Sequence, residues 1–256
     1  MYGHEFEGFE KQSSFKVRSS HFKEGVLAKI FAYAGMALLI TTIVAVGLGI
    51  LFANTLLKEY NDDSLLAFYI ILIASAILSI VLSIVIHAKA MRDRNILIPG
   101  ILYSICLGVM FSSFVIYVDW MLIAIAFGIT TILFFIMFFI AVLSRKRDFS
   151  VFAIIGSTMF IGIMLVGIVF SILLLFRADL GWSWTFYWIY FGISVALLVA
   201  ALSITQYDIK NIVNIAQSGE VSNNLALFCA YTLYADFIYI LIRVLRILII
   251  LFGNRK

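Results

Sequence analysis

The sequence predicts an all-α integral membrane protein with seven transmembrane helices, and two observations support this. The chain of 256 residues is 64% hydrophobic and 12% charged, whereas soluble domains are about a quarter charged. Its apolar residues form seven long runs, each near or above the ~20 residues that cross a bilayer as a helix. We therefore expect a single transmembrane domain over residues 29–256, preceded by a flexible N-terminal tail over residues 1–28.

The predicted spans are joined by short connections. Asp119 alone separates the third span from the fourth, so that turn must be tight. Pro99 falls in the first turn of the third span, where a missing backbone N–H costs little. The seven spans lie at about 29–53, 65–88, 96–118, 120–143, 151–176, 183–205 and 225–251.

Basic residues are concentrated on one side of the predicted spans. The tail and the alternate connections hold 12 of the 18 lysines and arginines, and such a bias marks the cytoplasmic face. The N-terminus is therefore predicted to be cytoplasmic. The opposite loops hold few basic residues and an acidic set that would attract cations: Glu59, Asp62, Asp63, Asp119 and Asp179.

The seventh predicted span carries a polar stripe. Its members recur at spacings of three or four, which places them on one helical face. They are Cys229, Thr232, Asp236, Tyr239, Arg243 and Arg246. The two arginines oppose the charge bias if the segment crosses, but a long apolar run without glycine or proline favours crossing. A helix with such a stripe is the least suited to lipid, so we expect it to be central and surrounded by the other six.

Asp236 is the residue of this stripe that most needs an explanation. It lies about 12 residues into its helix, roughly 18 Å from the start. An ionisable group at that depth costs about 2.5–3.5 kcal/mol on insertion scales and marks a functional site by default. Arg243 is about 10 Å further along the axis, so the partner of Asp236 should come from another helix. Asp208, at the end of the sixth span, is either a solvated residue beside Lys210 or a member of the same site.

Other kinds of chemistry have little support in the sequence. His87 is the one histidine within the predicted spans, and one histidine cannot make the three-ligand site of a metal hydrolase. No serine or cysteine is paired with a base at a suggestive spacing, and Cys106 and Cys229 read as small buried hydrophobes. The basic residues behind the net charge of +4 are distributed by membrane topology, so the charge does not indicate a nucleic-acid-binding surface. We expect no enzyme, resident metal, cofactor or nucleic-acid partner.

Two segments resemble a known family. T-Q-Y-D-I-K-N-I, which contains Asp208, and A-Y-T-L-Y-A-D-F-I-Y-I-L-I-R-V-L-R, which contains Asp236, are similar to the last two helices of the transmembrane Bax-inhibitor-motif family, especially its bacterial calcium-leak members. The resemblance implies that Asp208 and Asp236 hydrogen-bond to each other as a pH sensor. It also implies a protein that passes Ca²⁺ down its gradient in a bacterial cell membrane.

A third segment extends the resemblance to the end of the second span. A-M-R-D-R-N-I-L-I-P-G-I-L-Y is similar to the family region that supplies an arginine to the aspartates, which implies this role for Arg92, with Arg94 as the fallback. The chain departs from the family pattern in a longer loop between the aspartates, in the added charge of Arg243, and in its long N-terminal tail.

The expected function follows from the physics of a carboxylate pair. Two carboxylates within hydrogen-bond reach in a low-dielectric site cannot both ionise without cost, so the pair should share one proton. A bond that breaks near physiological pH can bias a two-state helix bundle. We therefore predict a pH-sensitive cation (Ca²⁺) leak channel gated by the pair. Candidates for the seam or pore lining are Thr232, Tyr239, Arg243 and His87.

Two alternatives stay open at this point. A proton-coupled secondary transporter would use the same two aspartates as carriers, and inverted repeats or interrupted helices would support it. A membrane interaction or regulatory protein of the Bax-inhibitor type would act through binding partners. The expected partners in the leading hypothesis are the lipid bilayer, Ca²⁺ and protons.

Overall fold

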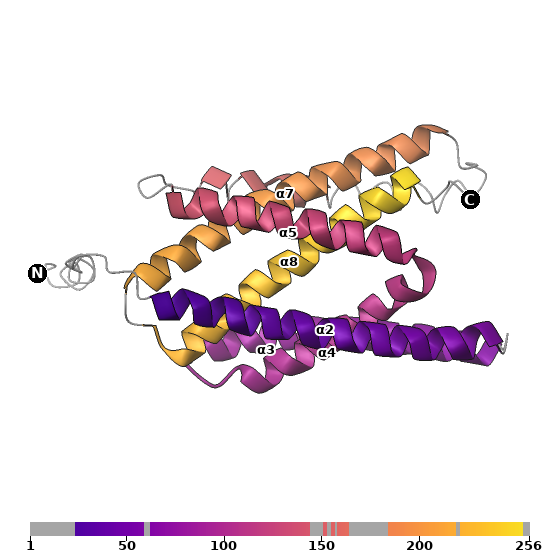
Figure 1. Ribbon diagram of the computed structural model, residues 1–256, viewed down its shortest axis with the longest axis horizontal. Coiled ribbons are helices and arrows are strands. Elements are labelled where there is room, and N and C mark those ends of the chain that lie inside the picture. The colour runs from indigo at the N-terminus through magenta and orange to yellow at the C-terminus, as the bar shows by residue number, and fades with distance from the viewer. Residues whose placement is uncertain are drawn as a thin grey trace, which may run out of the picture.

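The computed structural model describes residues 24–58, 62–143, 151–152, 155–156, 158–163, 184–218 and 221–252. Within these residues every regular element is a helix (Figure 1), which confirms the all-α prediction. Residues 1–23 of the predicted tail and residues 164–176 of the fifth predicted span lie outside this part of the chain.

The described helices follow the predicted spans closely. They are α2 (Glu24–Lys58), α3 (Asp62–Ala90), α4 (Leu97–Tyr117), α5 (Trp120–Leu143), α7 (Trp184–Ser218) and α8 (Asn223–Phe252). Helical stretches within 151–163 lie where the fifth span is predicted. Two boundaries differ clearly from the prediction: α2 begins inside the predicted tail, and α7 continues as helix well past residue 205.

Five of these helices are long and apolar enough to cross a membrane: α2, α3, α4, α5 and α7. Their outer faces expose large apolar side chains, for example Ile43 at 70% and Ile84 at 64%. Such faces suit hydrocarbon, and helices satisfy their own backbone hydrogen bonds there. The chain is therefore a multi-pass membrane protein.

Helix α8 lies in the middle of the bundle. In Figure 1 it runs diagonally between one group made of α2, α3 and α4 and another made of α5 and α7. It packs against α2, α3, α5 and α7, and its buried side chains fall on several faces, from Ala226 near its start to Leu248 near its end. The central placement predicted for the last helix is confirmed for the described helices.

Close contact between α2 and α4 depends on small residues. A Cβ atom added to Gly108 would lie 2.9 Å from the carbonyl oxygen of Thr41 and 2.7 Å from Cβ of Val44. Gly49 is similarly close to Val115. Thr41 spans the contact, since its hydroxyl donates to the carbonyl oxygens of Ala37 and Ser104, both at 3.0 Å. Small residues let membrane helices approach in this way.

The long C-terminal half of α7 is held by the end of α5. Nζ of Lys210 donates to the carbonyl oxygen of Ala141 at 3.0 Å, and Nε2 of Gln206 donates to that of Met137 at 3.2 Å. The last carbonyls of a helix lack intrahelical partners, so a lysine there acts as a cap. Lys210, predicted as a residue of a cytoplasmic connection, is 6% exposed and belongs to the helix core.

The start of α8 is tied to two other elements. Ser222 caps the helix, with its Oγ accepting from N of Leu225 at 3.1 Å. Asn224 donates through Nδ2 to the carbonyl oxygen of Asp93 at 2.9 Å, in the turn between α3 and α4. Lys29 of α2 donates to Oδ1 of Asn223. These contacts fix the register of α8 against both α2 and α3.

The lysine cap predicts a stability effect. Lys210→Met keeps the apolar stem of the side chain but removes the donor to Ala141. Hydrogen bonds that involve a charged group contribute about 1.5–3 kcal/mol, so we expect a lower midpoint of thermal unfolding in detergent. Asn214→Met, at an exposed position one turn further along α7, is the control. Equal midpoints for the two variants would contradict the capping role.

Candidate functional site

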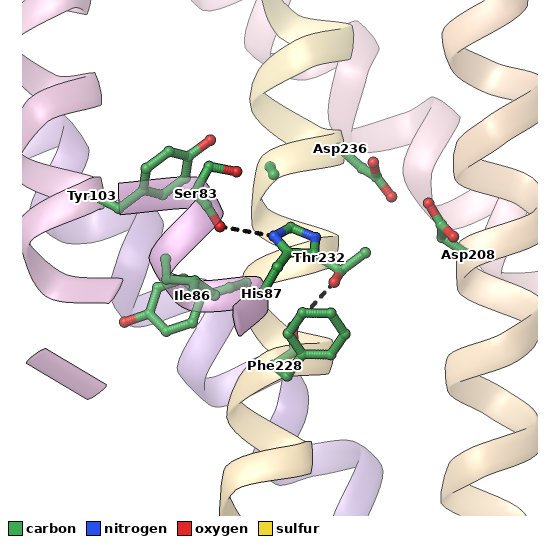
Figure 2. Close-up of a pocket in the computed structure, with 10 residues that line it drawn as sticks. Ser83, Ile86, His87, Tyr103, Asp208, Phe228, Thr232 and Asp236 are labelled. Carbon is green, nitrogen blue, oxygen red and sulfur yellow. Dashed lines mark hydrogen bonds between the residues drawn. The ribbon is translucent and has the colours of Figure 1, made fainter. Parts of the chain in front are cut away.

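The two aspartates singled out by the sequence line one pocket. It has a volume of about 230 Å³ and lies between α3, α4, α7 and α8. Figure 2 shows Asp208 on one helix and Asp236 on the next, with their carboxyl groups directed toward each other. The remaining lining residues are Ser83, Ile86, His87, Tyr103, Phe228, Tyr231, Thr232 and Ala235.

The continuation of α7 past Thr205 brings Asp208 to this pocket. In the sequence the two aspartates are separated by a predicted loop, but Asp208 lies within a continuous helix that packs along α8. Thr205 itself is 2% exposed, so the helix does not end at the membrane boundary predicted from the apolar run. Asp208 is therefore a member of the site rather than a solvated residue of a connection.

Asp236 is the more deeply enclosed member of the pair. Its Oδ2 is shielded from solvent and has no hydrogen-bond partner among the described residues. The direct bond that the family resemblance implies is therefore not made by this oxygen here. A buried polar atom without a partner costs about 1–3 kcal/mol, and more when charged. This oxygen can therefore bind a proton, or accept a hydrogen bond from a water molecule or a neighbouring side chain.

His87 is the ionisable residue that α3 brings to the pocket. Its Nδ1 lies 2.8 Å from the carbonyl oxygen of Ser83, one turn earlier on the same helix. Because a carbonyl oxygen accepts, Nδ1 is the donor of this bond. The ring also packs edge-on against Phe228 of α8, with centroids 5.3 Å apart. Figure 2 shows the ring between its own helix and the two aspartates.

Arg92 and Arg94 lie outside this pocket. Both are exposed, in the turn that follows α3, and neither is among the residues that line it. The sequence-based assignment of Arg92 to the aspartates therefore requires a different arrangement of this turn. In the described structure, His87 is the basic residue among those that line the pocket.

The polar stripe of α8 has two parts. Thr232 lines the pocket, and its hydroxyl donates to the carbonyl oxygen of Phe228 at 3.1 Å. Further along, Nη2 of Arg243 donates to the hydroxyl of Tyr239 at 2.9 Å, with the guanidinium 4.9 Å from the ring centroid. Nε of Arg243 is buried without a partner among the described residues. The stripe is thus acidic near the pocket and cationic beyond it.

Tyrosines around the pocket were not predicted from the sequence. Tyr103 lines it from α4, and its ring contacts that of Tyr234, which is fully buried. The hydroxyl of Tyr234 is 2.5 Å from Oγ1 of Thr41. Tyr231 packs its ring directly over Gly100, where an added Cβ would lie 1.9 Å from Cζ. The sequence signal for this contact was a glycine directly after the proline of the third span.

A resident metal site is not seen in the described part of the chain. There, no group of three or more histidine, cysteine, aspartate or glutamate side chains is arranged to hold a metal ion. Both cysteines are buried free thiols.

Comparison with known families gives a match over nearly the whole chain. The family described as "Inhibitor of apoptosis-promoting Bax1" matches residues 23–254. The chain belongs to the Bax inhibitor family. No curated protein matches it. The match begins beside the start of α2 and ends just after α8. All the described helices of this Bax inhibitor family member, and both aspartates, therefore lie inside the matched region.

The contact between Tyr231 and Gly100 predicts a second stability effect. Gly100→Ala places a methyl group inside the tyrosine ring and should lower the unfolding midpoint, because overpacking costs about 1–3 kcal/mol. Gly128→Ala in α5 is the control, since a Cβ there meets no atom within 4 Å and alanine favours helix. Tyr231→Ala should cost less stability in the Gly100→Ala background than in the wild-type background, because the truncated side chain no longer meets the added methyl group. A neutral Gly100→Ala would show that the ring does not occupy this position.

Proposed function

We propose that this protein is a pH-sensitive Ca²⁺ leak channel gated by Asp208 and Asp236. The observation that carries the proposal is the meeting of the two carboxyl groups, from neighbouring helices, in one enclosed pocket. Membership of the Bax inhibitor family agrees with it. The proposal includes a cytoplasmic N-terminus, from the distribution of basic residues, and a bacterial cell membrane, from the resemblance to bacterial members.

Electrostatics gives the pair two states. Two carboxylates that face each other in a low-dielectric pocket repel when both are ionised, and one shared proton removes the repulsion. The protonated pair can bond across the pocket and hold α7 against α8. The doubly ionised pair pushes these helices apart or recruits a cation. Since α8 is the central helix, its displacement opens the bundle along the polar stripe.

The partner-free oxygen of Asp236 supports this role. A purely structural carboxylate in a helix bundle is normally satisfied by hydrogen bonds, because an unsatisfied one destabilises the fold. Oδ2 of Asp236 is buried without a partner among the described residues, so this oxygen can bind a proton or take part in a bond with Asp208 across the pocket. Both a proton and a passing cation could bind this oxygen. In the leak-channel hypothesis the proton only controls the cation flux, whereas in the transporter hypothesis the two movements are coupled.

Neutralising either aspartate should remove the pH response. Asp236→Asn and Asp208→Asn cannot lose a proton, and the titration belongs to both groups together. We expect Ca²⁺ flux into proteoliposomes to lose its change between roughly pH 6 and 8 in both variants. Asp119→Asn, which removes a carboxylate from the exposed turn before α5 but can still cap Met121 N through its amide oxygen, is the control.

The outcomes of this experiment separate the hypotheses. Wild-type pH profiles in both aspartate variants would refute the pair as the sensor. The transporter hypothesis would be favoured by two results together. The wild-type protein would show no downhill Ca²⁺ leak, and both aspartate variants would lose proton movement coupled to substrate. Absence of both activities in a folded wild-type preparation would favour a regulatory protein that acts through partners.

Arg92 is proposed as the group that balances the doubly ionised pair after the helices move. Arg92→Ala should then shift the pH midpoint of Ca²⁺ flux upward, because double ionisation loses its counter-charge. Arg94→Ala, also exposed in the same turn, should leave the midpoint unchanged. His87→Gln tests the group already in the pocket. A shift in His87→Gln alone would move the counter-charge role from Arg92 to His87.

A further inference from the structure

A second cavity of about 250 Å³ lies between α2 and α5, with α8 as its floor. Figure 1 shows α8 passing behind the space between these two helices. Gly35 and Leu38 line it from α2, Thr131 and Phe134 from α5, and Leu233 and Phe237 from α8. We call this cavity the α2–α5 groove. It lies on a different face of α8 from the pocket that holds Asp236.

The chemistry of the groove is apolar. Its polar side chains already have partners: the hydroxyl of Thr131 donates to the carbonyl oxygen of Phe127 at 2.8 Å, and that of Tyr234 bonds to Thr41. A water molecule needs two to four polar partners, and apolar cavities stay dry. Neither water nor a hydrophilic ligand is therefore suited to this space.

The groove opens toward the bilayer. Its rims carry exposed side chains on both helices, Leu39 at 63% and Phe135 at 59%, and both helices qualify as membrane spans. At one end Phe31 and Phe138 meet edge to face, with centroids 5.2 Å apart, and join α2 to α5. An occupant must therefore enter sideways from the hydrocarbon region. At Gly35 the wall is open, because a Cβ there would meet no atom within 4 Å.

We propose that the α2–α5 groove binds one acyl chain of a membrane lipid against α8. The mouth of the groove faces the hydrocarbon of the bilayer, and the methylenes of an acyl chain need no hydrogen bonds. The aromatic rings of Phe134 and Phe237 provide apolar surface for an acyl chain. The ring of Phe134 is only half-buried, so an occupant would add contacts to it, and such contacts are a large part of packing energy. The proposal is independent of ion leak and goes beyond it.

Photolabelling tests the site directly. The full-length protein is reconstituted with a phosphatidylcholine that carries a diazirine in the middle of one acyl chain, irradiated, and mapped by peptide mass spectrometry. Leu233 and Phe237 are 2% and 6% exposed, so lipid outside the bundle cannot reach them. Labels on these two residues are expected, besides labels on rim residues such as Leu39.

A matched pair of variants on α2 tests occupancy. Gly35→Phe fills the groove and should reduce labelling of Leu233 and Phe237 severalfold. Gly47→Phe adds the same ring at a second open position of α2 outside the lining and should leave the labelling unchanged. Thr131→Phe blocks the groove from α5 and takes the place of Gly35→Phe if that variant does not fold.

Three results would overturn the proposal. The first is labelling of the rims with no label on α8. The second is equal labelling of α8 in the Gly35 and Gly47 variants. The third comes from a photoreactive phenylalanine analogue placed at Leu38: cross-links to residues 1–23 or 164–183 of this chain, in place of lipid adducts, would identify a protein segment as the occupant. None of these readouts depends on ion flux, so they stand apart from the leak assay.

Discussion

A carboxylate on the central helix is the constraint on which the rest of the structure depends. Asp236 in lipid would cost about 2.5–3.5 kcal/mol on insertion scales, so α8 must be enclosed by protein. Helices α2, α3, α5 and α7 provide that enclosure. Gly108 and Gly49 let α4 approach α2 closely, and the hydrogen bonds of Asn223 and Asn224 fix the position of α8 along its axis. The buried charge thus explains both the order of packing and the fixed register.

The second aspartate is positioned by helix geometry. Gln206 and Lys210 are four residues apart and lie on one face of α7, where they bond to the end of α5. Asp208, midway between them, projects from the opposite face, toward α8. Fixing one face of α7 on α5 therefore presents Asp208 to the pocket. In the proposed gate, α7 and α5 would form the stationary side, and the side of α8 that carries Asp236 would move.

The sequence predicted the helices whose positions depend on the length and periodicity of apolar runs. It did not predict contacts that depend on residues of other helices. The long apolar runs predicted where the described spans lie. The polar stripe around Asp236 correctly predicted that the last helix is central. The apolar run of the sixth span ends at residue 205, although a meeting of Asp208 with Asp236 requires helix beyond it. The polar residues of this extension bond to carbonyl groups of α5, such as that of Ala141. The contact of Tyr231 with Gly100 joins two distant helices, and the glycine after Pro99 marks only one side of it. Arg92 lies outside the pocket, whereas His87 lines it.

The central claim is that Asp208 and Asp236 share one proton in the enclosed pocket. Infrared difference spectroscopy across a pH series measures this directly, since a protonated carboxyl group has its own C=O stretching band. The account predicts one such band in the wild-type protein that disappears as the pH rises through neutrality, and a shifted pH midpoint of the remaining band in both Asp208→Asn and Asp236→Asn, because each carboxyl group titrates under the influence of the other. An unchanged midpoint in both variants, or fully ionised carboxylates at every pH tested in the wild-type protein, would contradict it.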